Sequence, residues 1–143
     1  MGKDSGIFKM NPLHTLKRFD VESSGKQYKV MADVCIVGDD IAVIIWGGDQ
    51  PHIGSVAFAA PRPSRKDPKK ISSTASVFTL LGHKEDYITK EISEQLSSML
   101  NKNVVVLAGM HWNNISSDGI KVVIKNCKEI AKIILKKIQE EIK

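Results

Sequence analysis

The first half of the chain alternates apolar and polar residues in short runs, which is the pattern of half-buried β-strands. Residues 27–37 alternate and then become apolar, Gly38-Asp39-Asp40 interrupts the run, and residues 41–46 continue with β-branched side chains. We therefore predict a β-hairpin with its turn at residues 38–40.

Another short strand is predicted over residues 53–60, after a break in the pattern at Gly47-Gly48-Asp49-Gln50-Pro51. Pro61-Arg62-Pro63 is expected to end this strand, because proline cannot donate a hydrogen bond to a ladder. The first half of the chain is thus expected to form an antiparallel meander. Residues 64–73 are polar and rich in lysine, and we interpret them as a mobile connection.

The second half of the chain changes to helical spacing. Residues 74–81 form a predicted strand that stops at Gly82. Apolar residues then recur every three to four positions, which predicts a helix over residues 84–100. An entirely apolar strand of the kind that is buried on both faces follows at residues 104–108.

The last segment is predicted to be a long amphipathic helix, with Ser116, Ser117 and Asp118 as candidate capping residues. One face is apolar and consists of Ile120, Val123, Cys127, Ile130, Ile134 and Ile138. The opposite face carries Lys121, Lys125, Lys128, Lys132 and Lys136. We interpret these lysines as a solvated face, because no aromatic residue lies between them to stack on bases.

The length of 143 residues and the ordinary composition predict one domain over residues 16–143, preceded by a flexible arm at residues 1–15. The expected fold class is α+β, with a mixed, mostly antiparallel sheet and two helices from the second half packed on it. No apolar run approaches the ~20 residues of a bilayer span, and no secretory signal pattern is present. We therefore expect a cytoplasmic protein without a membrane partner.

Cysteine usage and charge narrow the function further. Cys35 and Cys127 form no Cys-x-x-Cys pair, and we interpret both, together with Trp46, as core residues. The net charge of +5 comes almost entirely from lysine, and only three arginines are present to make bidentate contacts with phosphates. No nucleic-acid partner is therefore predicted.

Three histidines, His52, His83 and His111, follow predicted strands and are flanked by turn residues. If the strands before His83 and His111 are parallel and joined by the helix, both end at one edge of the sheet. His52 joins them only if its loop opens on the same edge, which the sequence does not decide. Such a trio can hydrogen-bond a ligand, bind a divalent metal or transfer protons, and the alternative is that each histidine only braces its own loop.

Other residues are candidates for ligand binding. The helix that follows Gly82 can hold a phosphate at its N-terminus, with Lys84 or Arg62 adding positive charge. Trp112 and Asn113 offer a planar face and an amide, although a lone loop tryptophan often serves packing instead. No P-loop, dinucleotide fingerprint, nucleophile elbow or paired-carboxylate pattern occurs, so a self-sufficient hydrolase or dehydrogenase is not indicated.

Four of these loops resemble one known family. They read Gly47-Gly48-Asp49-Gln50-Pro51-His52-Ile53-Gly54, Pro61-Arg62-Pro63-Ser64, Leu80-Leu81-Gly82-His83-Lys84-Glu85-Asp86 and Ala108-Gly109-Met110-His111-Trp112-Asn113-Asn114-Ile115. In order and register, over about residues 26–137, they look like the LpdD-like prenylated-flavin chaperones, typified by the small accessory protein of gallate decarboxylase. The resemblance implies a fold similar to that of proteasome assembly chaperones, usually dimeric.

The resemblance also implies a function. Such a protein is a non-catalytic partner of reversible aromatic acid decarboxylases, and it holds prenylated FMN, or FMN, for delivery to the decarboxylase catalytic subunit. Carried onto this chain, the cofactor pocket consists of His52, Gly54, Arg62, Ser64, Gly82, His83, Lys84, His111, Trp112 and Asn113, with Arg62 or Lys84 on the phosphate. The insert at residues 64–73 departs from the family pattern.

The sequence thus predicts a homodimeric accessory protein rather than an enzyme. One alternative is a metal-dependent enzyme that uses His52, His83 and His111 to activate water. The other is an assembly chaperone whose loops grip a protein and no small molecule.

Overall fold

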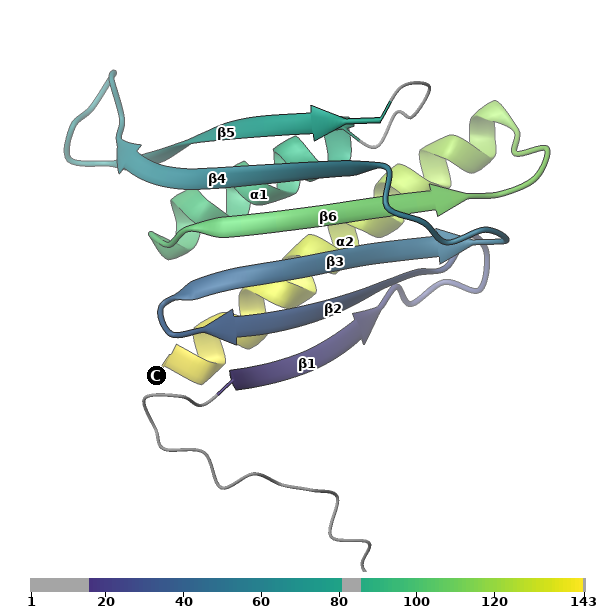
Figure 1. The fold of residues 1–143 in the computed structure, drawn as a ribbon, viewed down its shortest axis with the longest axis horizontal. Helices are drawn as coiled ribbons and strands as arrows, with labels where there is room; N and C mark the ends of the chain where they lie inside the picture. Colours follow the sequence, from purple (N-terminus) through teal and green to yellow (C-terminus); the bar gives the residue numbers. More distant parts are fainter. Residues whose placement is uncertain (1–15, 81–85, 143) are drawn as a thin grey trace, which may run out of the picture.

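The computed structural model describes residues 16–80 and 86–142 and shows one sheet with two helices against one of its faces (Figure 1). The predicted flexible arm at residues 1–15 lies outside the described residues. In the two described ranges, neither helix combines the length and the apolar character needed to cross a bilayer.

The elements follow one another in the order β1 (Leu16–Glu22), β2 (Val30–Val37), β3 (Asp40–Gly48), β4 (Ser55–Pro63), β5 (Ile71–Thr79), α1 (Asp86–Leu100), β6 (Val104–His111) and α2 (Ser117–Ile142). The predicted hairpin at residues 38–40, the strand before Pro61 and both helices are present. The predicted mobile connection is shorter than expected, because β5 begins within it.

The sheet has the strand order β1-β2-β3-β6-β4-β5, and among these six described strands only β3 and β6 are parallel neighbours. This confirms the predicted α+β class with a mixed, mostly antiparallel sheet. The predicted meander is wrong at one place, because β6 lies between β3 and β4. The physical reason is that β6 is apolar on both faces, so a central place between two strands buries it best.

The strand β1 was not predicted. Its sequence alternates charged residues with Phe19 and Val21, and Val21 pairs with Ala32 of β2 and is buried. β1 forms one edge of the sheet, where charged side chains remain solvated.

The prolines at positions 61 and 63 do not end β4. β4 pairs with β5 up to Pro63, whereas its pairing with β6 stops at Ala59. Both prolines therefore lie where β4 has one neighbour only, and their missing N–H groups cost no ladder hydrogen bond on the β6 side.

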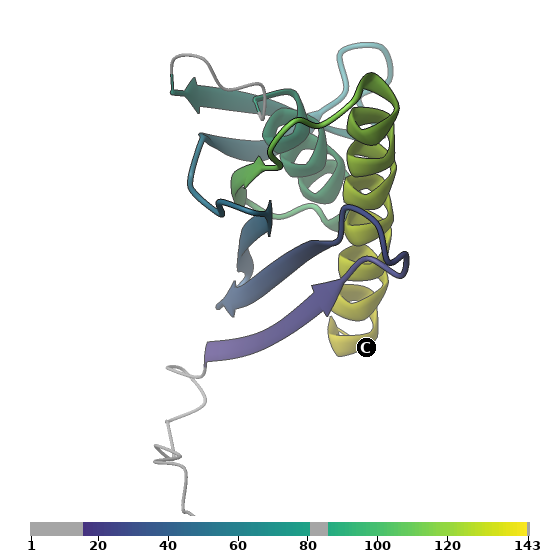
Figure 2. The same cartoon turned by 90° about the vertical axis from the view of Figure 1, so that its right-hand side faces the viewer.

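The core lies between the sheet and the helices (Figure 2). Val34, Val43 and Val106 face the helices and are fully buried. The predicted apolar face of α2 is buried except at Ile120, which is 46% exposed. The predicted cap of α2 is confirmed at Ser116, whose Oγ accepts a hydrogen bond from the Gly119 N–H at 3.0 Å.

Among residues 16–80 and 86–142, no helix covers the other face of the sheet (Figure 2). We call it the open face, and strand pairing assigns to it Trp46, Val56, Phe58, Phe78, Val105, Leu107, Cys35 and Ile44. Phe78 is 71% exposed and Phe58 is 51% exposed. The prediction of Trp46 and Cys35 as core residues is therefore wrong, because their positions in the pleat turn both away from the helices, and only Cys127 is buried as expected.

Candidate functional site

The described site residues meet at one end of the sheet, where several strands end or begin, and not along an outermost strand. Because β3 and β6 are parallel, both end there, and Gly48 at the end of β3 pairs with His111 at the end of β6. β4 begins at the same edge, so the loop that carries His52 lies beside His111. This answers the question that the sequence left open. We call Asp49, His52, Gly54, His111 and Asn113 the strand-end cluster.

Hydrogen bonds tie the two loops of the cluster together. The His111 carbonyl accepts hydrogen bonds from the N–H groups of Asp49 at 2.7 Å and Gln50 at 3.3 Å. The Gly54 N–H donates to the Ala108 carbonyl at 2.9 Å. Asp49 Oδ2 accepts from the Asn113 N–H at 2.9 Å, so the carboxylate holds the loop after β6 against the loop after β3.

Two glycines allow this close approach. Gly48 has a φ of +91°, and a Cβ there would stand 2.1 Å from the His111 carbonyl oxygen. A Cβ on Gly109 would stand 1.8 Å from the His52 carbonyl oxygen. The His52 loop therefore lies directly on the backbone of β6, and no larger residue fits at either position.

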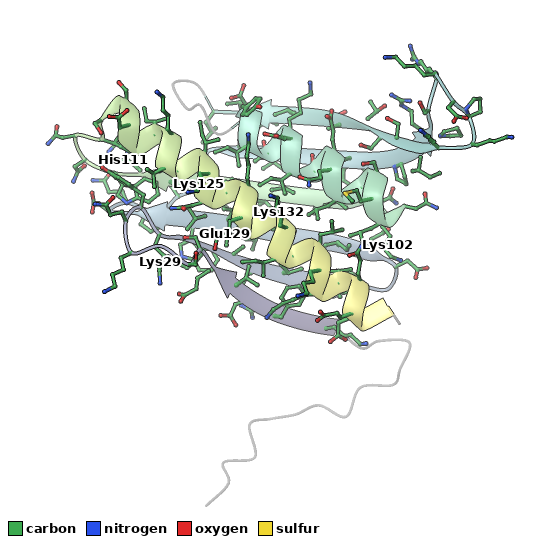
Figure 3. All side chains as sticks on the ribbon, turned by 180° about the vertical axis from the view of Figure 1, so that it is seen from behind. Lys29, Lys102, His111, Lys125, Glu129 and Lys132 are labelled. Atoms are coloured by element: carbon green, nitrogen blue, oxygen red, sulfur yellow. The ribbon has the colours of Figure 1, made fainter. Side chains whose placement is uncertain are left out.

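The two imidazoles are held differently. His52 is half-buried, and its Nδ1–H donates to the Gln50 carbonyl at 3.0 Å. In the neutral ring this hydrogen bond places the proton on Nδ1. The His111 side chain is exposed at the end of β6, in the position that Figure 3 labels.

Trp112 follows His111 but lies on the other side of the sheet. Its ring would stand 3.1 Å from a Cβ on Gly47, a position on the helix-covered face. Its ring also meets Tyr28 edge to face, with centroids 5.6 Å apart and an interplanar angle of 81°. Trp112 thus packs against the core, as the structural alternative for this residue assumed.

Gly82, His83 and Lys84 lie outside the described residues, so their predicted roles stay predictions. The described residues on either side reach the same edge of the sheet. The Leu80 N–H donates to the Gly54 carbonyl at 2.9 Å, and Thr89 Oγ1 lies 2.9 Å from Ser55 Oγ. Within the described ranges, no group of three His, Cys, Asp or Glu side chains is close enough to hold a metal ion.

Arg62 and Ser64 lie at the opposite end of β4. At ~3.3 Å per residue, Arg62 is roughly 23 Å from Ser55 along the strand. Arg62 donates to Thr74 Oγ1 at 2.6 Å and to the Pro63 carbonyl at 3.2 Å, and Ser64 Oγ accepts the Lys66 N–H at 3.3 Å. Within one chain, the structure therefore does not bring these two residues together with the strand-end cluster.

Sequence reasoning missed the turn between β1 and β2, which lies at the same end of the sheet as His111 (Figure 3). Tyr28 has a φ of 51°, and the Asn126 Nδ2 donates to the carbonyls of Gln27 at 3.1 Å and Tyr28 at 2.8 Å. Glu129 Oε1 accepts the Ser24 N–H at 2.8 Å. No periodic signal marks these residues, because their partners lie on a helix about a hundred positions later in the chain.

Across the described residues, this arrangement defines a class of fold: an α+β fold with two helices on one face of a six-stranded sheet and linked loops at one end of its strands. It matches the structure titled "Crystal Structure of a Novel Chaperone Complex for Yeast 20S Proteasome Assembly" with a TM-score of 0.58 and 14% identity, over 90% of this chain and 98% of that chain. At this identity the likeness is one of fold.

The sequence comparison identifies the family. The model described as "Prenylated flavin chaperone LpdD-like domain" matches residues 24–139, and the chain belongs to this family. It is 24% identical over 121 residues to Protein LpdD of Lactiplantibacillus plantarum (strain ATCC BAA-793 / NCIMB 8826 / WCFS1), which covers 85% of this chain and 84% of that protein. The resemblance found in the four loops is thereby confirmed.

Proposed function

We propose that this chain is a non-catalytic, cytoplasmic accessory protein that binds prenylated FMN, or FMN, and supports the maturation of a reversible aromatic acid decarboxylase. The observation that carries the proposal is the strand-end cluster, in a chain of the prenylated flavin chaperone family. Loops that are far apart in the sequence present two imidazoles and an amide at one edge of the sheet.

The chemistry of the cluster fits such a ligand. A flavin offers ring carbonyls, ring nitrogens and ribityl hydroxyls, which hydrogen-bond to imidazole and amide groups. When bound, the prenylated flavin supplies the reactive ring system that the decarboxylase uses. A carrier must also release it, and several modest hydrogen bonds from loop residues allow that better than one covalent anchor.

We infer a role for each residue of the cluster from its position. His52 and His111 bind the polar edge of the flavin, and the Asn113 side chain adds a further hydrogen bond. Gly109 carries no Cβ, which lets the His52 loop lie close against β6 and keeps His52 beside His111. We assign the phosphate to Lys84, which precedes α1 by two positions in the sequence, rather than to Arg62, because Arg62 belongs to the far end of β4.

Cofactor retention tests this proposal. The protein is incubated with reduced prenylated FMN and desalted, and its absorbance spectrum and phosphate content are recorded. We expect about one equivalent of retained flavin, and a loss of at least tenfold in affinity for His111→Ala. Arg62→Ala is the matched control and should retain the flavin.

Two outcomes would contradict the proposal. A colourless protein without phosphate excludes a flavin carrier, and co-purification with a decarboxylase subunit without any flavin points to the assembly chaperone instead. A loss of flavin in Arg62→Ala alone would move the site away from the strand-end cluster.

We further propose that two copies of the chain associate through the open face. At its centre, the strands β3, β6 and β4 present uncharged side chains, among them Ile44, Leu107 and Phe58. Charged residues such as Arg18 and Asp33 lie at its margin and form an ion pair. An apolar centre with a charged margin is typical of an interface, and in a symmetric dimer both copies use the same face.

A further inference from the structure

The two outermost strands of the sheet, β1 and β5, differ in how their free backbone groups are protected against the addition of another strand. β1 carries Lys17, Arg18, Asp20 and Glu22, and charges of this kind discourage the addition of another strand. β5 forms the other edge with nine residues, Ile71–Thr79, that include no charge and no proline. β5 is therefore a long, unprotected edge rich in β-forming residues.

Hydrogen bonds next to β5 show which of its backbone groups point outward. The Leu80 N–H donates to the Gly54 carbonyl, and the Ser64 N–H donates to the Lys70 carbonyl. Even-numbered residues of β5 are therefore the hydrogen-bonded partners of β4. Because this pattern alternates, the N–H and C=O groups of Ser73, Ala75 and Val77 point away from the sheet.

A groove of about 440 Å³ runs between this edge and α1. Ser72 and Ser73 line it from β5, and one stripe of α1 lines it with Tyr87, Lys90, Glu91 and Glu94. Within the described ranges, neither Glu91 nor Glu94 has an ion-pair partner. As far as the described residues go, the groove thus offers unpaired backbone groups on one side and an excess of negative charge on the other, because Glu91 and Glu94 outnumber Lys90.

We propose that this edge and groove bind an extended segment of the decarboxylase catalytic subunit by strand addition. The inference rests on the proposed function and adds to it the surface and the chemistry of the partner. The added strand forms main-chain hydrogen bonds with Ser73, Ala75 and Val77. Its side chains at alternate positions enter the groove, and a basic one lies against Glu91 and Glu94.

A second copy of this chain fits the same edge less well. Near the groove β5 carries only small side chains, from Ser72 to Ser76, so a second β5 would leave most of the 440 Å³ unfilled. The side chains around an unfilled cavity lack van der Waals contacts, and a strand with bulky side chains would supply them. The size of the groove therefore favours a different partner.

Amide hydrogen exchange on the unmodified protein tests the inference. Synthetic peptides that tile the decarboxylase catalytic subunit are added, and exchange is followed at single residues. We expect at least one peptide to slow the outward amides of Ser73, Ala75 and Val77 by tenfold or more. The amides of Thr74 and Ser76 already bond to β4 and should change little.

A pair of proline variants adds a matched comparison. Ala75→Pro removes an outward N–H from β5, and Asp20→Pro removes one from β1. In β1 the odd-numbered residues bond to β2, as the hydrogen bond from the Ser23 N–H to the Val30 carbonyl shows, so the N–H of Asp20 points outward. Peptide affinity should fall at least tenfold in Ala75→Pro and stay unchanged in Asp20→Pro. Thermal unfolding verifies that both variants fold, and the exchange result stands without them.

Three outcomes overturn the inference. The first is that no peptide protects these amides. The second is their protection in the protein without peptide, which means that a second copy or residues 1–15 occupy the edge. The third is protection confined to the strand-end cluster. Flavin retention is scored separately, so a protein that keeps its flavin but protects no β5 amide loses this inference and keeps the proposed function.

Discussion

At the scale of single residues, the strand-end cluster depends on two glycines, because neither carries a Cβ. A Cβ on Gly48 would collide with the backbone of His111 at the end of β6, and a Cβ on Gly109 would collide with the backbone of the His52 loop. The sequence predicted that His52, Gly54 and His111 belong to loops at strand ends, because turn residues flank them. It did not predict that Gly109 supports His52, since this contact depends on β6 lying next to the start of β4.

Gly109→Ala tests this contact. The new Cβ would stand 1.8 Å from the His52 carbonyl oxygen, so the His52 loop has to move. We expect a loss of about 1–3 kcal/mol in the free energy of unfolding, measured in urea, and weaker flavin retention. Gly25→Ala is the control, because nothing lies within 4 Å of its added Cβ. Equal stability of the two variants would contradict the described packing.

The cysteines give a second test at this scale. Burial raises the pKa of Cys127 from 9.0 to about 12, so its thiol stays protonated at neutral pH. A disulfide reagent should therefore modify half-buried Cys35 in the native protein and Cys127 only after unfolding. The reverse order of labelling would show that Cys127 is accessible.

The same shift makes stability depend on pH. The folded-state pKa lies above the unfolded-state value, so the stabilising contribution of the neutral thiol is fully present below the unfolded-state pKa. It is lost progressively as the pH rises towards about 12. Cys127→Ala should lose less stability than the native protein over this alkaline range in urea titrations.

At the scale of elements, α2 does more than cover the sheet. Its apolar face and its Ser116 cap were predictable, because helical spacing and capping are local properties of the sequence. Its hold on the turn between β1 and β2 was not, because Asn126 resembles any polar residue of an amphipathic helix. β1 was missed for a similar reason: its charged residues mask the alternation of Phe19 and Val21.

Asn126→Ala measures this hold. The change leaves the carbonyls of Gln27 and Tyr28 without their donors, so we expect a loss of about 1–3 kcal/mol in the free energy of unfolding. The near-UV circular dichroism should also change, since Tyr28 packs on Trp112. Lys125→Ala replaces the exposed neighbour and should stay within about 0.5 kcal/mol of the native protein. Similar losses in both variants would argue against a role for the amide.

At the scale of the whole molecule, the strand directions decide what meets. The sequence predicted the α+β class, and strands β5 and β6 do run in the same direction, with β4 between them. It also grouped Arg62 with His52. His52 precedes β4 and Arg62 lies near the end of β4, so the length of this strand separates them. A sequence motif does not show how far apart two side chains lie, whereas the number of residues in a strand does.

Phe58→Lys tests association through the open face. Phe58 is 51% exposed at the centre of this face, and a charge there should abolish the dimer in sedimentation experiments. Met99→Lys introduces the same charge at a side chain that is 56% exposed on α1 and should leave the dimer intact. A dimer that persists in Phe58→Lys, or is lost in Met99→Lys, would place the interface elsewhere.

The central position of β6 also constrains how the chain is made. The strands β1 to β3 and the pair β4 and β5 leave the ribosome first, yet β6 is the strand that joins them into one sheet. Until residue 111 has emerged, the nascent polypeptide holds two separate β-sheet fragments whose facing edges are unpaired. Completion of this fold therefore awaits the synthesis of β6, and a truncated product that stops before Val104 would expose those edges to aggregation.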